Sequence, residues 1–147
     1  MPKRRQQFIP NLDANRIIRS AKQICKAILD LNIPNQQKKP FLSRAIWLIT
    51  EAHGKYKTRY TSVRAMNCPT KKLRHEHVWP RKVLIQEMLD QPRRFKSILR
   101  RAIGCTVTIA ENAKLNRVSR KNPHLKGWER YRTAGIKWLR LSRNRCP

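Results

Sequence analysis

Residues 71–82 have the sequence KKLRHEHVWPRK, and this stretch decides how the second half of the chain is expected to fold. Residues 73–78 predict a short strand, and Pro80 ends it because proline has no N–H to donate to a sheet ladder. Glu76 lies here between two of the four histidines of the chain. In a protein with 8 Asp and Glu against 35 Lys and Arg, a carboxylate in this position indicates metal binding or acid–base chemistry.

The charge of the whole chain points to a polyanionic partner. A formal net charge of +27 over 147 residues makes the protein repel itself until anions neutralise it, so nucleic acid is the expected partner. An anionic membrane surface is a weaker alternative, because no long helical segment is basic on one side and bulky-apolar on the other. The sequence also has no apolar run of about 18 residues, so no membrane partner is expected.

Length and composition predict one domain with an α+β, predominantly helical fold. Residues 1–12 are predicted to be a basic, flexible arm, and residues 13–147 form the domain, with a basic tail at 119–147. The four cysteines stand singly, so neither a zinc ribbon nor a disulfide framework is expected, and Cys25 and Cys105 are expected in the core. A basic start without a following apolar stretch gives no signal peptide, so a cytoplasmic location is expected.

The N-terminal half predicts a pair of helices. The first should begin after Asp13 as N-cap and end near Ile33-Pro34, with apolar residues recurring at helical spacing. The second should begin near Pro40 and end at Gly54. The polar segment 55–70 fits a loop or a weak strand equally well.

The C-terminal half predicts two strands and a following helix, with helices inserted between the strands. The strand at 73–78 is followed by helical spacing over 81–102, and the β-branched alternation of 105–109 predicts a second strand. Thr108 and Glu111 have the spacing of a capping box, so a helix should follow, with Ala113, Leu115 and Val118 on its buried side. The tail should hold a short helix at 127–132 and then a turn into an edge strand at 134–138.

In this order of elements, residues 71–118 resemble the HNH, or ββα-metal, endonucleases. That family has Asp/Glu-His-Val/Ile-x-Pro on its first strand, and residues 76–80 (EHVWP) match it. The resemblance implies that Glu76 is a metal ligand and that His77 is the general base that activates water. It also implies a metal ligand near the start of the following helix, at Asn112, with Asn116 one turn further on. The long insertion at 81–102 and the missing cysteine pairs depart from the family pattern.

The chemistry of these side chains is consistent with that role. Oxygen ligands from Glu and Asn suit Mg²⁺, with Mn²⁺ as an alternative, and no organic cofactor is expected. His75 is expected as a support or a third ligand. Because side chains alternate along a strand, His75 and His77 should share one face and Glu76 the other, so one common site requires the strand to bend.

Clusters of cations surround the motif and recur along the predicted helices. Most are expected to hold phosphates without reading sequence. The candidate contacts are Arg74, Arg81, Lys82, Arg93, Arg94, Arg100, Arg101, Lys114, Arg117, Arg120, Arg130 and Arg132.

The sequence therefore predicts a small metal-dependent HNH-type endonuclease that hydrolyses DNA, similar to the stand-alone enzymes of mobile elements or phages. The alternative is a non-catalytic RNA- or ribosome-associated protein in which the motif is structural. A nuclease toxin would share the chemistry of the first prediction. DNA is favoured over RNA as substrate, and whether the protein works as a homodimer stays open.

Overall fold

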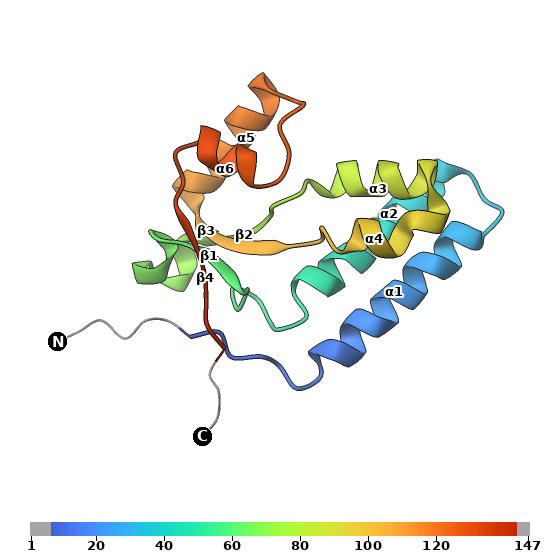
Figure 1. The fold of residues 1–147 in the computed structure, drawn as a ribbon, viewed down its shortest axis with the longest axis horizontal. Helices are drawn as coiled ribbons and strands as arrows, with labels where there is room; N and C mark the ends of the chain where they lie inside the picture. Colours follow the sequence, from blue (N-terminus) through green and yellow to red (C-terminus); the bar gives the residue numbers. More distant parts are fainter. Residues whose placement is uncertain (1–6, 144–147) are drawn as a thin grey trace.

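The computed structural model describes residues 7–143, and its α+β, mainly helical architecture confirms the predicted fold class. Residues 1–6, which hold Lys3, Arg4 and Arg5 of the predicted arm, and residues 144–147 lie outside the described part. Figure 1 shows the order of the elements. They are α1 (Ala14–Asp30), α2 (Asn35–Thr50), β1 (Tyr60–Ser62), β2 (Leu73–His77), α3 (Arg81–Asp90), α4 (Phe95–Leu99), β3 (Gly104–Thr108), α5 (Ile109–Lys121), α6 (Trp128–Thr133) and β4 (Trp138–Arg140), with 3-10 turns at Ala65–Asn67, Thr70–Lys72 and Pro92–Arg94.

Helices α1 to α4 form one hydrophobic core. Its buried members include Cys25 on α1, Leu42 and Ile46 on α2, and Leu84 and Met88 on α3. The structure places the start of α2 at Asn35, before the predicted start at Pro40. Pro40 is tolerated there because the carbonyl it leaves without a donor lies in the exposed first turn of the helix.

A mixed four-stranded sheet with strand order β2-β3-β1-β4 occupies the other half of the molecule. β2 and β3 pair antiparallel, β1 runs parallel to β3, and β4 closes the far edge antiparallel to β1. The segment left open by the sequence thus supplies β1, one of the two inner strands of the sheet. Helices α5 and α6 lie on one side of the sheet, whereas α1–α4 lie beyond the end of β2 that leads into α3 (Figure 1).

The predicted strand–insertion–strand–helix order is present. β2 and β3 form the antiparallel pair, α3 and α4 lie between them in sequence, and α5 follows β3 directly. The capping box at the start of α5 is complete: Glu111 N–H donates to Thr108 Oγ1 (3.2 Å), and Thr108 N–H donates to Glu111 Oε2 (3.0 Å). Ser62 Oγ donates to the same carboxylate oxygen at 2.6 Å, so the cap also ties α5 to β1.

The buried side of α5 differs from the prediction at one residue. Leu115 is buried and Val118 half-buried, but Ala113 is exposed. Glu111 is buried instead, and its carboxylate accepts two hydrogen bonds, from the Ser62 hydroxyl and from the Thr108 N–H.

A second hydrophobic core joins the sheet to α5 and α6. Val107 of β3, Leu115 of α5 and Tyr131 of α6 are fully buried in it, and Trp79 packs against both cores. Gly127 lies against the Trp79 indole, where a Cβ would come within 2.9 Å of the ring. The segment from 122 to 140 is therefore docked on the sheet through its aromatic residues.

Residues 7–12 differ from the flexible arm predicted for 1–12. Phe8 is 3% exposed, forms a bridge with Arg143 and donates its N–H to the Ser142 carbonyl. Asn11 hydrogen bonds to His53 and to the Ala52 carbonyl. This aromatic anchor holds the segment against the end of the sheet. None of the helices in residues 7–143 is long and apolar enough to cross a membrane.

Candidate nucleic-acid interface

The register of β2 against β3 decides where Glu76 lies. Glu76 pairs with Cys105, which is buried in the core between the sheet and α5 and α6, so its side chain lies on that face. Its Oε1 accepts a hydrogen bond from Arg130 Nη2 of α6 at 3.0 Å. Burial raises the pKa of Glu76, and the Arg130 guanidinium opposes that rise. The carboxylate is thus held by an arginine that comes from 54 residues further along the chain.

Arg130 is a structural clamp. Its side chain is 3% exposed, and its Nη1 donates to the carbonyls of His77 (3.1 Å) and Val78 (3.2 Å). Nε donates to Ser119 Oγ at 2.9 Å. A guanidinium bonded to the end of β2 and to α5 has no free edge for a phosphate, so the predicted phosphate contact at Arg130 does not fit this geometry.

The two histidines lie on the opposite face of β2. Both Nε2 atoms contact the Thr50 hydroxyl of α2, at 3.1 Å for His75 and 3.0 Å for His77. The Trp47 ring packs at 4.9 Å from His75 and 4.5 Å from His77, centroid to centroid. Gly104 makes room for this cluster, since a Cβ there would come within 2.6 Å of the His75 ring. The strand therefore does not bend to bring Glu76 and the histidine rings to one side.

Burial keeps both histidines neutral. It lowers the pKa of His75 to about 4, with Arg81 adding to the effect, and lowers the pKa of His77 to about 3, with His75 and Arg81 adding to it. A neutral imidazole has the lone pair that a general base needs, but so low a pKa makes it a weak proton acceptor near neutrality. The contacts with Thr50 and Trp47 make this pair part of the join between α2 and the sheet.

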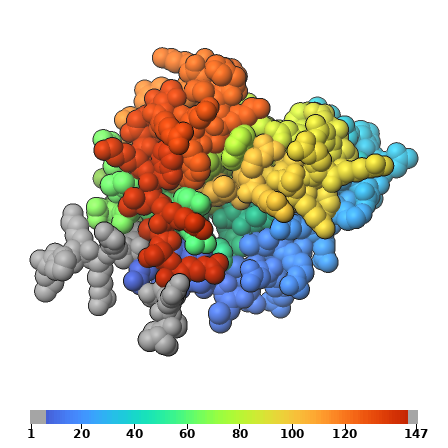
Figure 2. Space-filling view, viewed as in Figure 1, coloured from blue at the N-terminus to red at the C-terminus, as the bar shows by residue number. Residues whose placement is uncertain are grey.

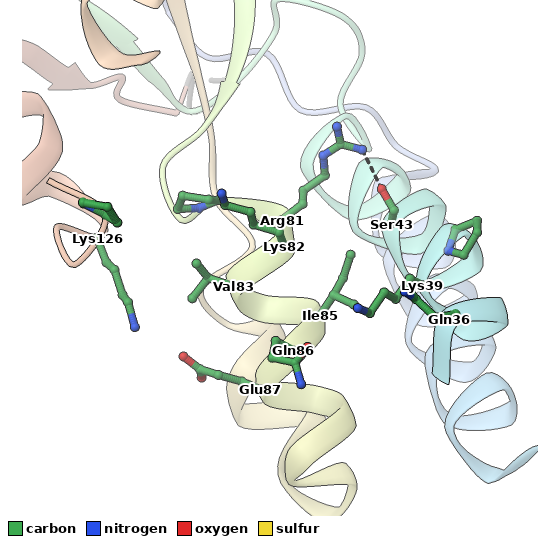
Figure 3. A pocket seen from close by; sticks show the side chains of 13 residues that line it. Gln36, Lys39, Ser43, Arg81, Lys82, Val83, Ile85, Gln86, Glu87 and Lys126 are labelled. Atoms are coloured by element: carbon green, nitrogen blue, oxygen red, sulfur yellow. Dashed lines mark hydrogen bonds between the residues drawn. The ribbon is translucent and has the colours of Figure 1, made fainter. Parts of the chain in front are cut away.

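A groove passes from α2 and α3 toward α5. One part, of about 1100 Å³, lies over α3 between α2 and the loop that carries Lys126 (Figure 3). A second part, of about 570 Å³, reaches Glu76 and His77 and the side chains of α5. The two parts adjoin, since residues 80–82 line both of them. In the space-filling view α3 and the α5–α6 unit lie on either side of a hollow (Figure 2).

The groove is strongly cationic because its acids are already neutralised. Glu76 is paired with Arg130, and Glu87 with Arg101, whose guanidinium also packs on Trp79. Apart from Arg130, five cations line the groove, and none of them forms an ion pair with a described carboxylate. They are Lys39, Arg81, Lys82, Arg120 and Lys126.

Arg81 is positioned by its neighbours. Its Nη1 donates to Ser43 Oγ at 2.6 Å, drawn as the dashed line in Figure 3, and its guanidinium lies 4.9 Å from the centre of the Trp47 ring. A cation fixed in this way loses little conformational freedom when it binds an anion.

Helix α5 lines the groove with Asn116, Ser119 and Arg120, and Asn112 is not among the lining residues. Glu76 and Asn116 line the same part of the groove, so Asn116, one turn beyond the predicted Asn112, is the α5 asparagine that accompanies Glu76 there.

These residues fit the divalent cation of the HNH resemblance only in part. Glu76 and Asn116 are oxygen donors on one groove, of the kind that a hydrated Mg²⁺ accepts. His77 lines the same part of the groove, but its Nε2 and that of His75 are held by the Thr50 hydroxyl, so the rings do not complete the set. Within residues 7–143 no three His, Cys, Asp or Glu side chains gather into a metal-binding group. The predicted metal site stays a prediction.

The remaining predicted cations lie in four places. Arg93, Arg94 and Arg100 are exposed around α4, away from the groove lining, and Arg74 is exposed on β2. Lys114 and Arg117 line a separate hollow on α5, and Arg132 lies near β4. Lys39 and Lys126, which the sequence prediction omitted, belong to the groove. The two residues lie on segments far apart in the sequence, so only the tertiary structure brings them together.

The chain matches no protein-family model, no curated protein and no solved structure.

Proposed function

We propose that this protein binds nucleic acid along the groove between α2, α3 and α5, with the phosphate backbone on its cations. The observation that carries the proposal is the pairing of both groove carboxylates with arginines, which leaves five lining cations without a carboxylate partner. Cations whose charge is not compensated within the protein release the condensed counterions of a nucleic acid on binding. The net charge of +27 supplies attraction over a longer range.

The groove proposal predicts a specific loss of salt-dependent binding. Replacing the exposed Lys82, Arg120 and Lys126 together by alanine removes three phosphate contacts. We expect affinity for DNA and RNA oligomers to fall roughly 100-fold, and the slope of log affinity against log salt to fall by about 2–3. Fluorescence anisotropy over a salt series measures both.

The matched control is a triple alanine variant at Arg93, Lys96 and Arg100, which are exposed cations outside the groove lining. It changes the net charge by the same amount and should lose much less affinity. Equal losses in the two variants would mean that binding follows overall charge, and the groove would then be the wrong site.

A second candidate function is phosphodiester cleavage in the same groove, as the HNH resemblance implies. The observation that favours it is that Glu76 and Asn116 line one groove on a β2–β3–α5 unit of the predicted order. A divalent cation held by these two residues would offset the charge on a phosphate. His77 remains the predicted base, although its buried ring and low pKa argue against that role.

Cleavage is tested with supercoiled plasmid DNA and Mg²⁺ or Mn²⁺. If this function holds, Asn116→Ala and Glu76→Gln should each lower the rate of nicking roughly 100-fold while salt-dependent binding persists. Asn112→Ala is the matched control, one turn away on the same helix and outside the groove lining, and should cleave like the wild type. A wild-type protein that binds but never nicks would leave only the binding function.

A further inference from the structure

A second hollow, of about 560 Å³, lies beside the edge strand β4 and plays no part in the groove. Trp138 lines it together with the apolar side chains of Val63, Ile136 and Leu139. Val63 and Leu139 are 42% and 45% exposed, although both are apolar. Arg132 and Lys137 complete the lining. An aromatic, apolar pocket that also contains two cations is suited to a flat apolar ligand that carries negative charge.

The Trp138 ring is held rigidly from one side. Trp128 stacks on it with ring centroids 4.6 Å apart and an interplanar angle of 6°, and Tyr131 packs edge-on at 5.8 Å. The Arg132 guanidinium carbon lies 5.8 Å from the centre of the same ring. Because Trp128 covers one face, Arg132 lies over the other.

The gap between Trp138 and Arg132 is close to what a planar ring requires. A ring in van der Waals contact with both groups needs roughly 7 Å between them, more than the 5.8 Å from the guanidinium carbon to the ring centre, so the exposed Arg132 side chain has to move outward to admit it. Gly135 adds open space, since a Cβ there would meet no atom within 4 Å. A nucleobase is a planar ring of this kind, and it stacks on tryptophan and on arginine alike.

A line of cations connects this pocket with the groove. Lys137 and Val63 also line a smaller hollow that reaches Lys114 on α5. Lys114 lines a further hollow with Arg117 and Lys121 of the same helix. On the next turn Arg120 belongs to the groove itself. A flexible nucleic-acid strand that crosses α5 would therefore meet a cation at each step between the two sites.

We propose that the Trp138 pocket stacks an unpaired base of single-stranded nucleic acid between the Trp138 indole and the Arg132 guanidinium. The backbone of that strand follows the cations of α5 toward the groove. The inference therefore rests on the proposed nucleic-acid binding and specifies that the bound nucleic acid is single-stranded. A duplex keeps its bases stacked on one another and offers no free base face to the pocket.

The test compares an oligothymidine with an abasic oligomer of the same length and charge. The wild-type protein should bind the oligothymidine roughly tenfold more tightly, with quenching of tryptophan fluorescence. Trp138→Leu should remove this preference and leave binding of the abasic oligomer unchanged. Val63→Phe fills the hollow from an exposed position, so it gives the same readout if Trp138→Leu fails to fold. Its control is Ile24→Phe, equally exposed on α1.

Each outcome decides between the two sites. If the wild type binds both oligomers equally, the proposal of base stacking at Trp138 is wrong and the proposal of backbone binding in the groove is unaffected. If the wild type prefers the oligothymidine but the triple alanine variant of Lys82, Arg120 and Lys126 binds as tightly as the wild type, the groove proposal is wrong and the stacking proposal is supported. If Val63→Phe changes only the oligomeric state in sedimentation and not the binding of oligothymidine, the hollow is a protein contact and the proposal is wrong.

Discussion

Replacing Arg130 by alanine should lower the free energy of unfolding by about 3–5 kcal/mol, because the change leaves a buried carboxylate without its partner. Arg130 is 3% exposed and holds Glu76, Ser119 and the carbonyls of His77 and Val78. The free energy of unfolding of a domain is typically only about 5–15 kcal/mol, so this single change should remove a large part of it. Urea denaturation followed by circular dichroism measures the loss.

Arg132→Ala is the matched control on the same helix. Its guanidinium is exposed and packs loosely over Trp138, so we expect a loss below about 1 kcal/mol. Arg130→Met combined with Glu76→Met removes both charges and should be more stable than Arg130→Ala, because no buried charge is left alone. A loss below about 1 kcal/mol for Arg130→Ala would contradict the structural role of this ion pair.

Acidification from about pH 7 to about pH 5 should lower the stability by about 4 kcal/mol through His75 and His77. Burial lowers their pKa values in the folded protein to about 4 and about 3, below the usual 6.5. Between these values the unfolded chain binds more protons than the folded one. The stabilisation that comes from the two neutral histidines is therefore fully present above about pH 6.5 and is lost as the pH drops toward 4 and 3. At pH 5 each histidine contributes a loss of about 2 kcal/mol.

The surroundings of the two rings explain why protonation is unfavourable. Their centroids lie 5.0 Å apart, Thr50 offers one oxygen to both Nε2 atoms, and Arg81 adds a third positive charge nearby. Glu76 works in the opposite direction at the acidic end, since burial raises its pKa. The histidine contribution is therefore read from the difference between the wild type and a variant that lacks the two histidines.

The control for the pH effect is the double variant His75→Leu/His77→Leu, measured with a chelator present. Its absolute stability will differ, but the slope of stability between about pH 6.5 and pH 5 should flatten. His124→Leu changes an exposed histidine in the loop before α6 and should keep the wild-type slope. An unchanged slope in the double variant would show that other groups cause the acid sensitivity.

Local signals in the sequence predicted several elements correctly. Thr108 and Glu111 form the capping box that their spacing indicates, because this interaction depends only on residues within one helical turn. The alternation of residues 73–77 correctly placed His75 and His77 on one face and Glu76 on the other. The partners of these side chains were not predictable, because Thr50 and Arg130 lie 27 residues before His77 and 54 residues after Glu76.

The surroundings of the EHVWP motif at residues 76–80 depend on residues that are distant in the sequence. By itself the sequence determined the charge of the protein, the strand that carries Glu76 and the helix that follows β3, since each depends on composition or on neighbouring residues. Only the tertiary structure decided that Arg130 neutralises Glu76, that Asn116 and not Asn112 lines the groove with it, and that scattered cations form one groove. Those outcomes depend on packing between distant segments, because the path of the backbone and not the order of the residues sets which side chains meet.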